Sequence, residues 1–462
     1  MREKDLERRL TEYNYPEELV STIKTLRGAG YDAFLVGGCV RDIMLEREVV
    51  DFDIATDARP EDVIKLFRKV IPTGIKHGTV TVIEGGMEIE ITTFRTESGY
   101  SDARRPDKVE FVSSIEDDLR RRDFTINAFA YDPLEHEFID LFDGVSDLYK
   151  GVIRAVGDPV ERFREDGLRP LRAVRIATAL GFEIEMRTLI AIGETLECFK
   201  RVAKERVLDE LRKIMRAVKP SVGFEYMRET GILEIIFPEL LEGYGVTQNE
   251  FHAYDIYTHS LYSADFAPID KPLVRWAALL HDVGKARTRE VREDGRVTFY
   301  NHEVVSVRMA MVMLERIRFP KKEMEYVCNL IRWHMFNYTP EWTDSAVRRF
   351  IRRVGVDAVA DLFDLRIADF HANGLNLGFP PYLDEFKKRI ESILEAGDAI
   401  TVRDLKVDGN DVMKIYGIGP SEKVGRVLNE LLSVVIDEPQ KNEREYLLNL
   451  LREWAQREGD ED

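Results

Sequence analysis

The spacing of apolar residues changes once along this chain of 462 residues, and the change separates two kinds of structure. Over about the first 150 residues, short apolar runs alternate with glycine turns, as in Ala33–Val36, Thr79–Glu84 and Met87–Phe94. From about Gly157 to the end, apolar residues recur at three-to-four spacing. The sequence therefore predicts an α+β fold, with a small α/β head followed by a long all-α remainder.

Several long helices are expected in the all-α part. The predicted helices are 162–180, 205–218, 272–285, 303–317, 322–335 and 384–395. Breaks near residues 155, 245 and 375 predict four domains, namely a head (1–155), a neck (156–245), a body (246–375) and a tail (376–462). This number agrees with the two to four domains expected for a chain of this length.

Composition narrows the class of protein. No apolar run approaches the roughly 20 residues that a membrane span needs, so we expect no membrane segment. The N-terminus is too charged for a secretory signal, and the three widely spaced cysteines fit a reducing cytosol, which predicts a cytoplasmic protein. The net charge of −18 lowers the expectation of nucleic-acid binding. It does not exclude such binding, because a local cluster of lysine and arginine can still hold phosphates.

Two aspartates behind a glycine turn form the first candidate site. Asp51 and Asp53 lie two positions apart in a strand-like stretch, so their side chains are expected on one face. Converging carboxylates suit Mg²⁺, and Glu90 has the strand parity to supply a third. Gly37-Gly38 ends a strand and begins a helix, where backbone N–H groups bind phosphate, and Arg41 follows. The aspartates alone also fit a solvated strand edge, but the combination favours a nucleotide site.

Five segments match, in order, the motifs of one known family. They are 35–42 with 51–56 (LVGGCVRD and DFDIAT), 121–128 (RRDFTINA), 143–157, 165–175 (EDGLRPLRAVR) and 205–210. On these motifs the chain resembles the class II tRNA nucleotidyltransferases, which comprise CCA-adding enzymes and related bacterial poly(A) polymerases. The resemblance covers at least residues 30–220, and the segment 407–454 is also similar to bacterial members. It implies a polymerase β-like nucleotidyltransferase head with Mg²⁺, followed by a helical neck, body and tail.

The resemblance also implies which residues act on the nucleotide. Asp51 and Asp53 are implied as the catalytic Mg²⁺ ligands. The implied nucleotide-binding residues are Gly38, Arg41, Arg122, Asp166, Arg169, Arg172 and Arg175.

The residue types of the implied base-reading pair fit that role. Asp166 and Arg169 are three positions apart, on one face of the predicted helix 162–180. A carboxylate accepts from an exocyclic amine and arginine donates to a ring nitrogen or carbonyl, so the pair can favour C and A over U and G. Without the head motifs, this spacing is typical of ion pairs on a surface helix.

Three local features bear on this assignment. Pro170 lies inside the predicted helix and is expected to kink it, and Glu46 stands where many relatives have glycine. Segment 205–210, with Arg206 and Glu210, resembles the helix that braces the base-reading motif. The segment Glu97–Lys108 resembles the flexible loop that helps these enzymes switch from C to A, although an ordinary surface hairpin is the alternative.

The body carries a second candidate site. Six of the eight histidines lie between residues 252 and 371. Several of them, with two aspartates, resemble the ordered metal ligands of HD-domain phosphohydrolases, namely His259, His281, Asp282, His302, His334 and Asp369. Such ligands suit a divalent transition metal or Mg²⁺ that activates water, and Gly284 is expected to cap the helix that ends at His281. A scaffold without activity is the alternative, and His77, His136, His252 and His371 are left unassigned.

The leading hypothesis is a tRNA nucleotidyltransferase that builds or repairs the 3′-terminal CCA from CTP and ATP without a template and releases pyrophosphate. Its HD domain would trim phosphates from damaged 3′ ends. One alternative adds only A, or poly(A). Another is an HD phosphohydrolase whose head senses nucleotides. The expected partners are the tRNA acceptor end, CTP and ATP, and the sequence leaves the oligomeric state open.

Overall fold

The structure is a computed structural model that describes residues 3–98, 108–375 and 381–461. The chain forms two compact units, one of Met1–Leu241 with Met313–Phe319 and one of Glu242–Val312 with Pro320–Asp462. The finer division into four domains stays a prediction. Within the described ranges, no helix combines the length and the apolar character that crossing a membrane requires.

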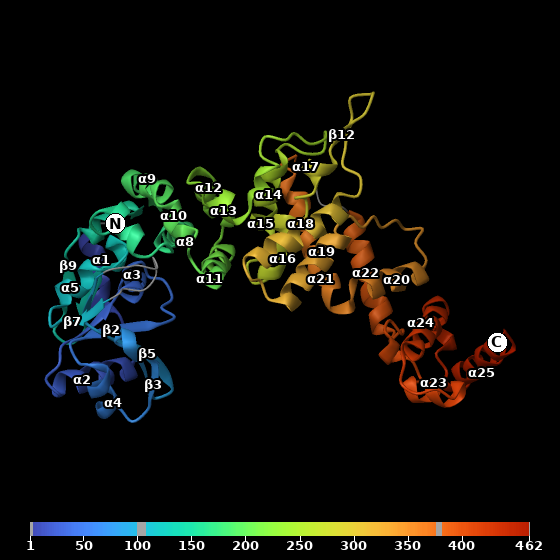
Figure 1. The fold of residues 1–462 in the computed structure, drawn as a ribbon, viewed down its shortest axis with the longest axis horizontal. Helices are drawn as coiled ribbons and strands as arrows, with labels where there is room; N and C mark the ends of the chain where they lie inside the picture. The colour runs from blue at the N-terminus through green and yellow to red at the C-terminus, as the bar shows by residue number, and fades with distance from the viewer. Residues whose placement is uncertain (1–2, 99–107, 376–380, 462) are drawn as a thin grey trace. The chain divides into compact units, whose positions relative to one another are not determined.

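A seven-stranded sheet forms the centre of the head in the first unit (Figure 1). Its strands follow the order β3 (Val70–Gly74), β4 (Thr79–Glu84), β5 (Met87–Thr93), β2 (Phe52–Thr56), β1 (Ala33–Val36), β8 (Phe129–Asp132) and β9 (Glu137–Asp140). Neighbouring strands are antiparallel except β2 and β5, which run parallel. The predicted mixed head is confirmed, as are its strand at 33–36 and the hairpin around Gly85-Gly86.

Helices complete the first unit. Those of the head are α1 (Glu3–Glu12), α2 (Glu17–Gly28), α3 (Gly38–Met44), α4 (Pro60–Leu66), α5 (Ile115–Arg120) and α6 (Gly144–Lys150), with a hairpin of β6 (Arg95–Ser98) and β7 (Lys108–Phe111). Those that follow are α7 (Pro159–Glu165), α8 (Arg169–Leu180), α9 (Met186–Glu194), α10 (Leu196–Phe199), α11 (Lys204–Met215), α12 (Pro220–Glu229), α13 (Ile232–Ile236) and α14 (Pro238–Leu241). Between them β10 (Val152–Ile153) pairs with β11 (Glu183–Ile184).

One face of the head sheet is apolar and fixes the strand ends that carry the first candidate site. Phe34 and Val36 of β1 pack with Ala55 of β2 and with Ile115 and Leu119 of α5. All four residues of β1 are buried, as a short apolar strand at the centre of a sheet requires. The polar residues that follow β1 and flank β2 are therefore held by a rigid core.

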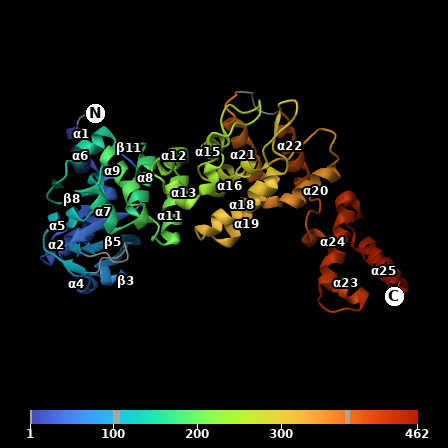
Figure 2. The same cartoon turned by 45° about the horizontal axis from the view of Figure 1, so that its top comes forward.

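The second unit is almost wholly helical (Figure 2). Its helices are α15 (Ile256–Phe266), α16 (Pro272–Leu280), α17 (Lys285–Thr288), α18 (His302–Arg316, whose last turn belongs to the first unit), α19 (Lys321–Trp333), α20 (Asp344–Val354), α21 (Val356–Ala372), α22 (Pro381–Glu395), α23 (Gly409–Tyr416), α24 (Glu422–Asp437) and α25 (Arg444–Glu461). A small hairpin joins β12 (Glu290–Val291) to β13 (Val297–Thr298). Helices α15, α16, α19 and α21 pack against one another. The helices predicted at 303–317, 322–335 and 384–395 are confirmed as α18, α19 and α22.

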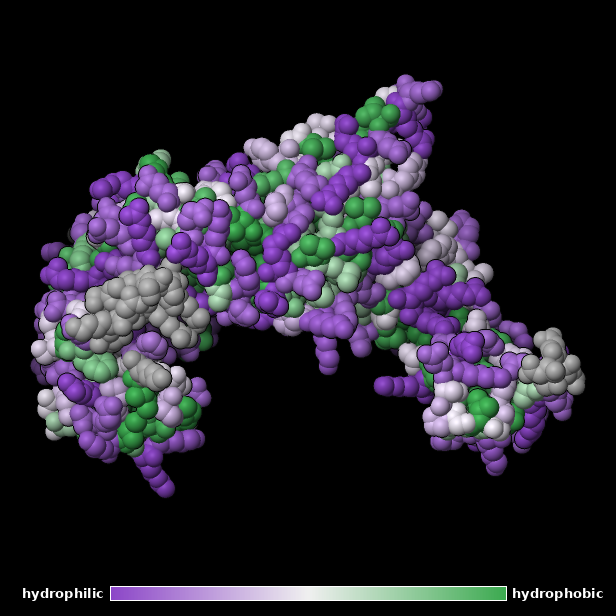
Figure 3. Space-filling model, in the orientation of Figure 1, coloured by the Kyte–Doolittle hydropathy of each residue, from purple (hydrophilic) through white to green (hydrophobic). Residues whose placement is uncertain are grey.

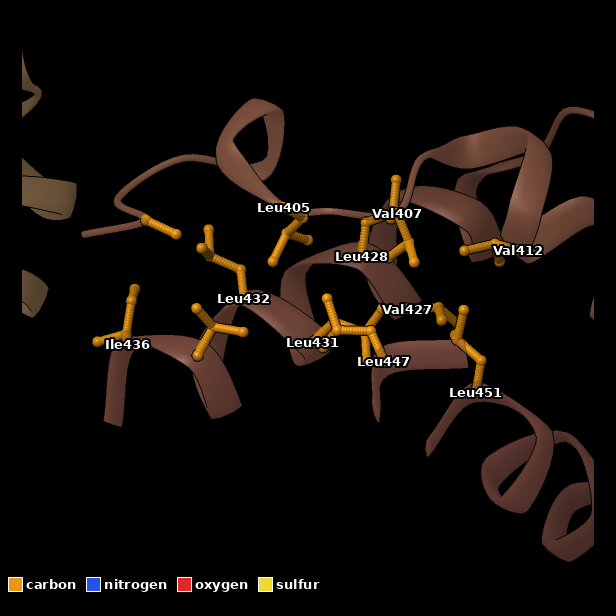
Figure 4. Close-up of a cluster of buried hydrophobic side chains, with 12 residues drawn as sticks. Leu405, Val407, Val412, Val427, Leu428, Leu431, Leu432, Ile436, Leu447 and Leu451 are labelled. Atoms are coloured by element: carbon orange, nitrogen blue, oxygen red, sulfur yellow. The ribbon is translucent and has the colours of Figure 1, made fainter. Parts of the chain in front are cut away.

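The C-terminal helices have an apolar core of their own (Figure 4). Leu431 and Leu432 of α24 and Leu447 and Leu451 of α25 are buried in it to 0–1% exposure. Burial of a leucine side chain contributes roughly 1.5–3 kcal/mol, so this cluster holds α24 and α25 together. By contrast, hydrophilic residues dominate the molecular face shown in Figure 3, with apolar residues in scattered patches, as the high charge content requires.

Candidate functional site

The glycine turn after β1 brings backbone close to charged side chains. Gly37 has a φ of +78°, and a Cβ there would lie 2.9 Å from Nη1 of Arg122 and 3.9 Å from Oδ2 of Asp53. Only glycine adopts this backbone without strain and leaves room for the arginine. Helix α3 then begins at Gly38, and Arg41 lies in that helix.

The predicted carboxylates lie beside this turn. Asp53 is in β2 and pairs in register with Glu90 of the parallel strand β5, while Asp51 directly precedes β2. Burial raises the pKa of Asp53 to about 6, and the Glu90 and Asp51 carboxylates add to the effect while Arg122 opposes it. A shared cation relieves the repulsion between carboxylates that lie this close, and hard oxygen ligands suit Mg²⁺. The residues present therefore fit the predicted ion.

All nine residues predicted for nucleotide transfer line one cavity of about 840 Å³. They are Gly38, Arg41, Asp51, Asp53, Arg122, Asp166, Arg169, Arg172 and Arg175. Among the described lining residues, nine basic side chains face six acidic ones, although the whole chain carries a net charge of −18. A positive cavity of this kind concentrates anionic substrates such as nucleoside triphosphates.

Buried acids hold the arginines of this cavity in place. Asp118 is fully buried and accepts hydrogen bonds from Arg121 Nη2 at 2.7 Å and Arg122 Nη2 at 3.1 Å. Asp123 accepts from Arg172 at 2.5 and 2.8 Å. Burial alone would raise the pKa of Asp123, but the Arg172 guanidinium outweighs it and holds that pKa well below its usual range. The guanidinium positions are therefore preorganised before substrate arrives.

The base-reading pair does not lie on one helix, so the predicted helix 162–180 is wrong. Helix α7 ends at Glu165, Asp166 is extended with a φ of −134°, and α8 begins at Arg169. Pro170 falls in the first turn of α8, where proline is tolerated, so the predicted kink is also wrong. The turn is held tightly, because a Cβ on Gly167 would lie 2.5 Å from the carbonyl oxygen of Cys198.

Helix α11 braces this turn, as the sequence predicts. Arg206 donates to both carboxylate oxygens of Asp166, at 3.1 and 2.7 Å. Arg175 donates to the buried Glu210 at 2.5 Å. Arg169 is buried and donates to the carbonyl oxygens of Arg162, at 2.9 Å, and Arg121, at 3.1 Å. The predicted loop Glu97–Lys108 lies largely outside the described residues.

The second unit brings the six predicted HD residues together from five helices or their ends. His259 lies in α15 and Asp369 in α21, and His302 begins α18. His281 and His334 follow the last residues of α16 and α19, and Asp282 comes directly after His281. All six side chains are buried.

The HD cluster has the chemistry of a cation site. His259 Nε2 lies 3.1 Å from Asp369 Oδ1 and 3.4 Å from Asp282 Oδ2, yet neither ring nitrogen of His259 makes a hydrogen bond to a described residue. Burial opposes the charged form of His281, but Asp282 and Asp369 outweigh it and raise the pKa of His281 to about 10. Orphaned buried nitrogens beside carboxylates fit a bound divalent metal.

Gly284 does not cap the helix that ends before His281, as the sequence predicted, but allows the backbone of α18 to lie close to it. Its φ is −78°, in the right-handed helical region, and a Cβ there would lie 2.6 Å from the backbone nitrogen of Ser306 and 2.7 Å from the carbonyl oxygen of His302. The absence of a side chain therefore lets α18 approach the residues that follow His281.

Sequence reasoning missed three residues at this cluster. Lys285 Nζ lies 2.6 Å from Asp282 Oδ2, and Arg366 donates to Asp369 at 2.8 Å. His252 Nε2 lies 3.5 Å from Lys285 Nζ, and burial lowers the pKa of His252 to about 3. Lys285 follows Asp282 by three positions, and Arg366 precedes Asp369 by three. Side chains at this spacing meet on a helix, so the sequence contained a signal for both contacts.

Comparison with known proteins places the chain in a family. Residues 33–154 match the Poly A polymerase head domain, residues 181–243 the probable RNA- and SrmB-binding site of polymerase A, and residues 252–369 the HD domain. The fold and these matches define a class of protein in which a poly(A) polymerase-type head is joined to a probable RNA-binding region and an HD domain.

Single relatives agree with these domain matches. A CCA-adding enzyme of Ligilactobacillus salivarius is 32% identical over 442 residues, which cover 94% of this chain and 96% of that enzyme. This chain belongs to the CCA-adding enzyme family. A Pediococcus pentosaceus CCA-adding enzyme is 51% identical over 218 residues, but the match spans only about half of each protein, 47% of this chain and 55% of that enzyme. The crystal structure of a Bacillus stearothermophilus CCA-adding enzyme with CTP aligns with a TM-score of 0.71 at 29% identity, over 96% of this chain and 99% of that one.

Proposed function

We propose that this chain adds or repairs the 3′-terminal CCA of tRNA, using CTP and ATP without a nucleic-acid template and releasing pyrophosphate. The observation that carries the proposal is the single cavity in which Asp51 and Asp53 face a group of arginines and the turn at Asp166. The three cysteines of the chain are free, which supports the further proposal that the enzyme works in the reducing cytoplasm.

The cavity residues divide the work of nucleotidyl transfer. Asp51 and Asp53 would hold Mg²⁺, which when bound neutralises the triphosphate and aligns the attacking 3′-hydroxyl. Arg41 and Arg122 would bind the phosphates, and the bare backbone at Gly38 lets them approach closely. Arg41 is oriented for this by Asn127, to whose Oδ1 it donates at 2.5 Å.

Base selection would depend on Asp166 and Arg169. The carboxylate of Asp166 accepts from the exocyclic amine that C and A share, and U and G present a carbonyl there instead. Arg206 fixes the orientation of that carboxylate through its two hydrogen bonds. Arg169 also pairs with the Glu165 carboxylate, and it would donate to the base from the N–H groups that this carboxylate and the Arg162 and Arg121 carbonyls leave available.

An extension assay on three tRNA transcripts, ending before CCA, after C and after CC, tests this proposal. Each transcript is offered CTP, ATP or both with Mg²⁺, and a reaction with EDTA is the control. We expect all three to grow to the same CCA end and then to stop. Extension of only the CC-ending transcript would make the enzyme an A-adding specialist, long A ladders would make it a poly(A) polymerase, and no extension would contradict nucleotidyl transfer.

We propose a second activity at the HD cluster, the hydrolysis of phosphate esters at damaged tRNA 3′ ends. A cavity of about 450 Å³ is lined by Asp282, His302, His334 and Asp369 together with Lys285 and Arg366. The two cationic side chains would hold the phosphate, and a bound metal would supply activated water.

Phosphate release from RNA with a 3′-phosphate or a 2′,3′-cyclic phosphate measures this activity, with Ni²⁺, Mn²⁺ or Mg²⁺ supplied in turn. We expect His281→Ala to lower the rate by about 100-fold or more, because it removes a metal ligand. His371→Ala is the matched control, since His371 is exposed and lies in α21 outside the cluster. If the unaltered chain released no phosphate with any of the three ions, the proposed hydrolysis would be wrong.

A further inference from the structure

Another cavity of the second unit has a volume of about 490 Å³, within the range of about 300–1,000 Å³ that is typical of ligand sites. The end of α19, the segment that follows it and α20 supply most of its described lining. Four of these lining residues are aromatic, three are arginines and one is a glutamate. This aromatic cavity is therefore locally cationic in a chain whose net charge is −18, and neither site described above uses its rings or its arginines.

Packed aromatic rings form the floor of the aromatic cavity. The rings of Phe336 and Phe350 have centroids 5.4 Å apart, and both side chains are buried. Trp342 packs edge-on against Phe350 with a centroid distance of 6.1 Å. Trp333, the last residue of α19, is only partly buried and adds an indole ring to the lining. Because rings fixed by such packing lose little freedom when a ligand binds, this lining is preorganised for a flat apolar partner.

Arginine side chains surround this floor. Arg332 and Arg349 are 43% and 46% exposed, and each has one acidic neighbour, Glu303 at 3.8 Å and Asp437 at 2.5 Å. Arg353 is exposed, and its side chain makes no hydrogen bond or ion pair with a described residue. Exposed ion pairs contribute little free energy, so the arginines remain available to an anion that enters the cavity.

The aromatic cavity adjoins the HD cavity. Met335 lines both of them, and the two residues before it divide between them, since His334 lines the HD cavity and Trp333 the aromatic one. The start of α18 divides in the same way, with His302 in the HD cavity and Glu303 in the aromatic cavity. Because consecutive Cα atoms are about 3.8 Å apart, the two cavities begin within a residue of each other. A strand whose end lies in one cavity therefore has its preceding unit beside the other.

The combination of rings and guanidinium groups selects a class of ligand. A wholly apolar ligand would leave the arginines without anions, and an acidic peptide without aromatic residues would leave the floor uncovered. A nucleotide of single-stranded RNA satisfies both, because its base stacks on an aromatic ring and its phosphate pairs with arginine. The Arg332 guanidinium lies 5.9 Å from the centroid of the Trp333 ring, so a base that stacks on this indole has a cation beside it.

We propose that the aromatic cavity binds the penultimate nucleotide of a single-stranded RNA 3′ end whose terminal phosphate lies in the HD cavity. The base stacks on Trp333, and Arg332 and Arg353 hold the phosphate that follows it. The substrate of the HD site is then an RNA end of at least two nucleotides and not a free nucleotide. This proposal rests on the hydrolase proposed above for the place of the terminal phosphate, but binding is measured without turnover, so the two proposals fail separately.

Isothermal titration calorimetry of the full-length chain in EDTA, which prevents metal-dependent hydrolysis, tests the proposal. The ligands are an RNA tetranucleotide with a 3′-phosphate and the same RNA without the base of its penultimate nucleotide. We expect that base to strengthen binding by about 10-fold, as for other stacked bases. Trp333→Leu is expected to abolish the difference between the two RNAs, and Trp333→Phe, which keeps a ring, to retain most of it.

Arg353→Ala is expected to weaken the binding of both RNAs by about fivefold, because it removes a cation that contacts the phosphate. Its matched control is Arg308→Ala, since Arg308 is an exposed arginine of α18 outside the described lining of both cavities, and its affinities are expected to stay unchanged. Circular dichroism checks that each variant folds. The exposed position of Arg353 keeps the test valid if Trp333→Leu does not fold.

Equal affinity of the unaltered chain for the two RNAs would overturn the proposal. A difference that survives Trp333→Leu, or an affinity unchanged by Arg353→Ala, would also overturn it, because the RNA would then be held elsewhere, as in the head. CMP that binds as tightly as the tetranucleotide would assign the cavity to a free nucleotide instead. Displacement of the RNA by an aspartate-rich peptide of equal charge would assign it to a protein partner, and either result would contradict the proposal.

Discussion

Replacing Asp51 and Asp53 together with alanine is expected to abolish nucleotide incorporation, with a loss of about a thousandfold or more in kcat/KM. Both side chains line the head cavity, and Asp53 lies in register with Glu90. Without them the cavity keeps its arginines, so the nucleotide is still attracted, but the ligands that would place Mg²⁺ between the triphosphate and the attacking hydroxyl are gone. The extension assay on the transcript ending before CCA measures the effect.

Glu88→Ala is the matched control for this double variant. Glu88 is an exposed acid on β5, two positions from Glu90, and it does not belong to the described lining of the cavity. We expect incorporation to stay within about twofold, as for most surface substitutions away from a site. Phosphate release at the HD site is expected to survive in the double variant. Incorporation retained within tenfold in that variant would contradict the assigned role of the two aspartates.

Loss of the two aspartates is not expected to destabilise the fold. The pKa of Asp53 is raised to about 6, so above that pH its ionised form is less favourable in the folded chain than in the unfolded chain. Removing the carboxylate removes this penalty. Thermal unfolding at pH 7.5 is therefore expected at the same or a slightly higher temperature, which separates loss of chemistry from loss of structure.

The parts of the fold and site that the sequence predicts correctly depend on local patterns. The strand at Ala33–Val36, the following glycine turn and the hairpin around Gly85-Gly86 are set by residues within a few positions of one another. The strand parity of Glu90 also predicted that it can offer a third carboxylate, and the parallel register pairs it with Asp53. For the HD cluster, it was the resemblance to the ordered ligands of HD-domain phosphohydrolases, and no local pattern, that named the six residues the structure brings together.

The base-reading turn shows where periodicity fails. Apolar spacing continues through residues 162–180, so it predicted one helix, although α7 ends at Glu165, Asp166 is extended and α8 begins only at Arg169. Two features decide the outcome, the close approach of Gly167 to the Cys198 carbonyl and the fit of Pro170 to the first turn of a new helix. The first is a contact across 31 positions of sequence, which no local pattern contains.

Glu46 stands where the resemblance to class II tRNA nucleotidyltransferases implies glycine, and its backbone has a conformation that glycine favours. Its φ is +55°, in the left-handed region where glycine is favoured, and its carboxylate lies 2.8 Å from Arg9 Nη2. A glycine at this position would adopt the backbone without strain. The ion pair joins residues 37 positions apart, which no local sequence pattern predicts.

The buried acid Asp118 is a positioning residue that sequence reasoning missed. It holds both Arg121 and Arg122, which directly follow α5, and the spacing of three and four positions was a signal that the sequence contained. The sequence does not reveal that the Asp118 side chain is buried. An exposed acid at this spacing would contribute little, whereas a fully buried one fixes both guanidinium groups.

Asp166→Ala is expected to lower kcat/KM for both CTP and ATP by about 10- to 100-fold and to lower that for UTP and GTP much less. The cost corresponds to one lost hydrogen-bonding partner of a base edge, about 1–3 kcal/mol. U and G present a carbonyl where C and A present an amine, so they gain nothing from the carboxylate in the unaltered enzyme. Single-nucleotide extension with each of the four triphosphates measures the change.

Asp209→Ala is the control for this variant, because Asp209 is an exposed acid on α11 outside the described lining of the cavity. It is expected to leave all four rates within about twofold. Arg206→Ala keeps the carboxylate but removes the two hydrogen bonds that orient it. We expect the same loss of discrimination from Arg206→Ala, with a smaller magnitude, because a mobile carboxylate still accepts from the amine part of the time.

The ratio of kcat/KM for CTP to kcat/KM for ATP is the most decisive measurement on Asp166→Ala. If one carboxylate reads the amine that both bases share, Asp166→Ala lowers the two rates by the same factor, and their ratio stays unchanged while selectivity against UTP and GTP falls. A change confined to one of the two nucleotides would contradict a shared reading by Asp166 and would require separate contacts for C and A. The unchanged ratio is expected because the turn at Asp166 is held from both sides, by Arg206 and by the close packing of Gly167, and so presents the same carboxylate to either base.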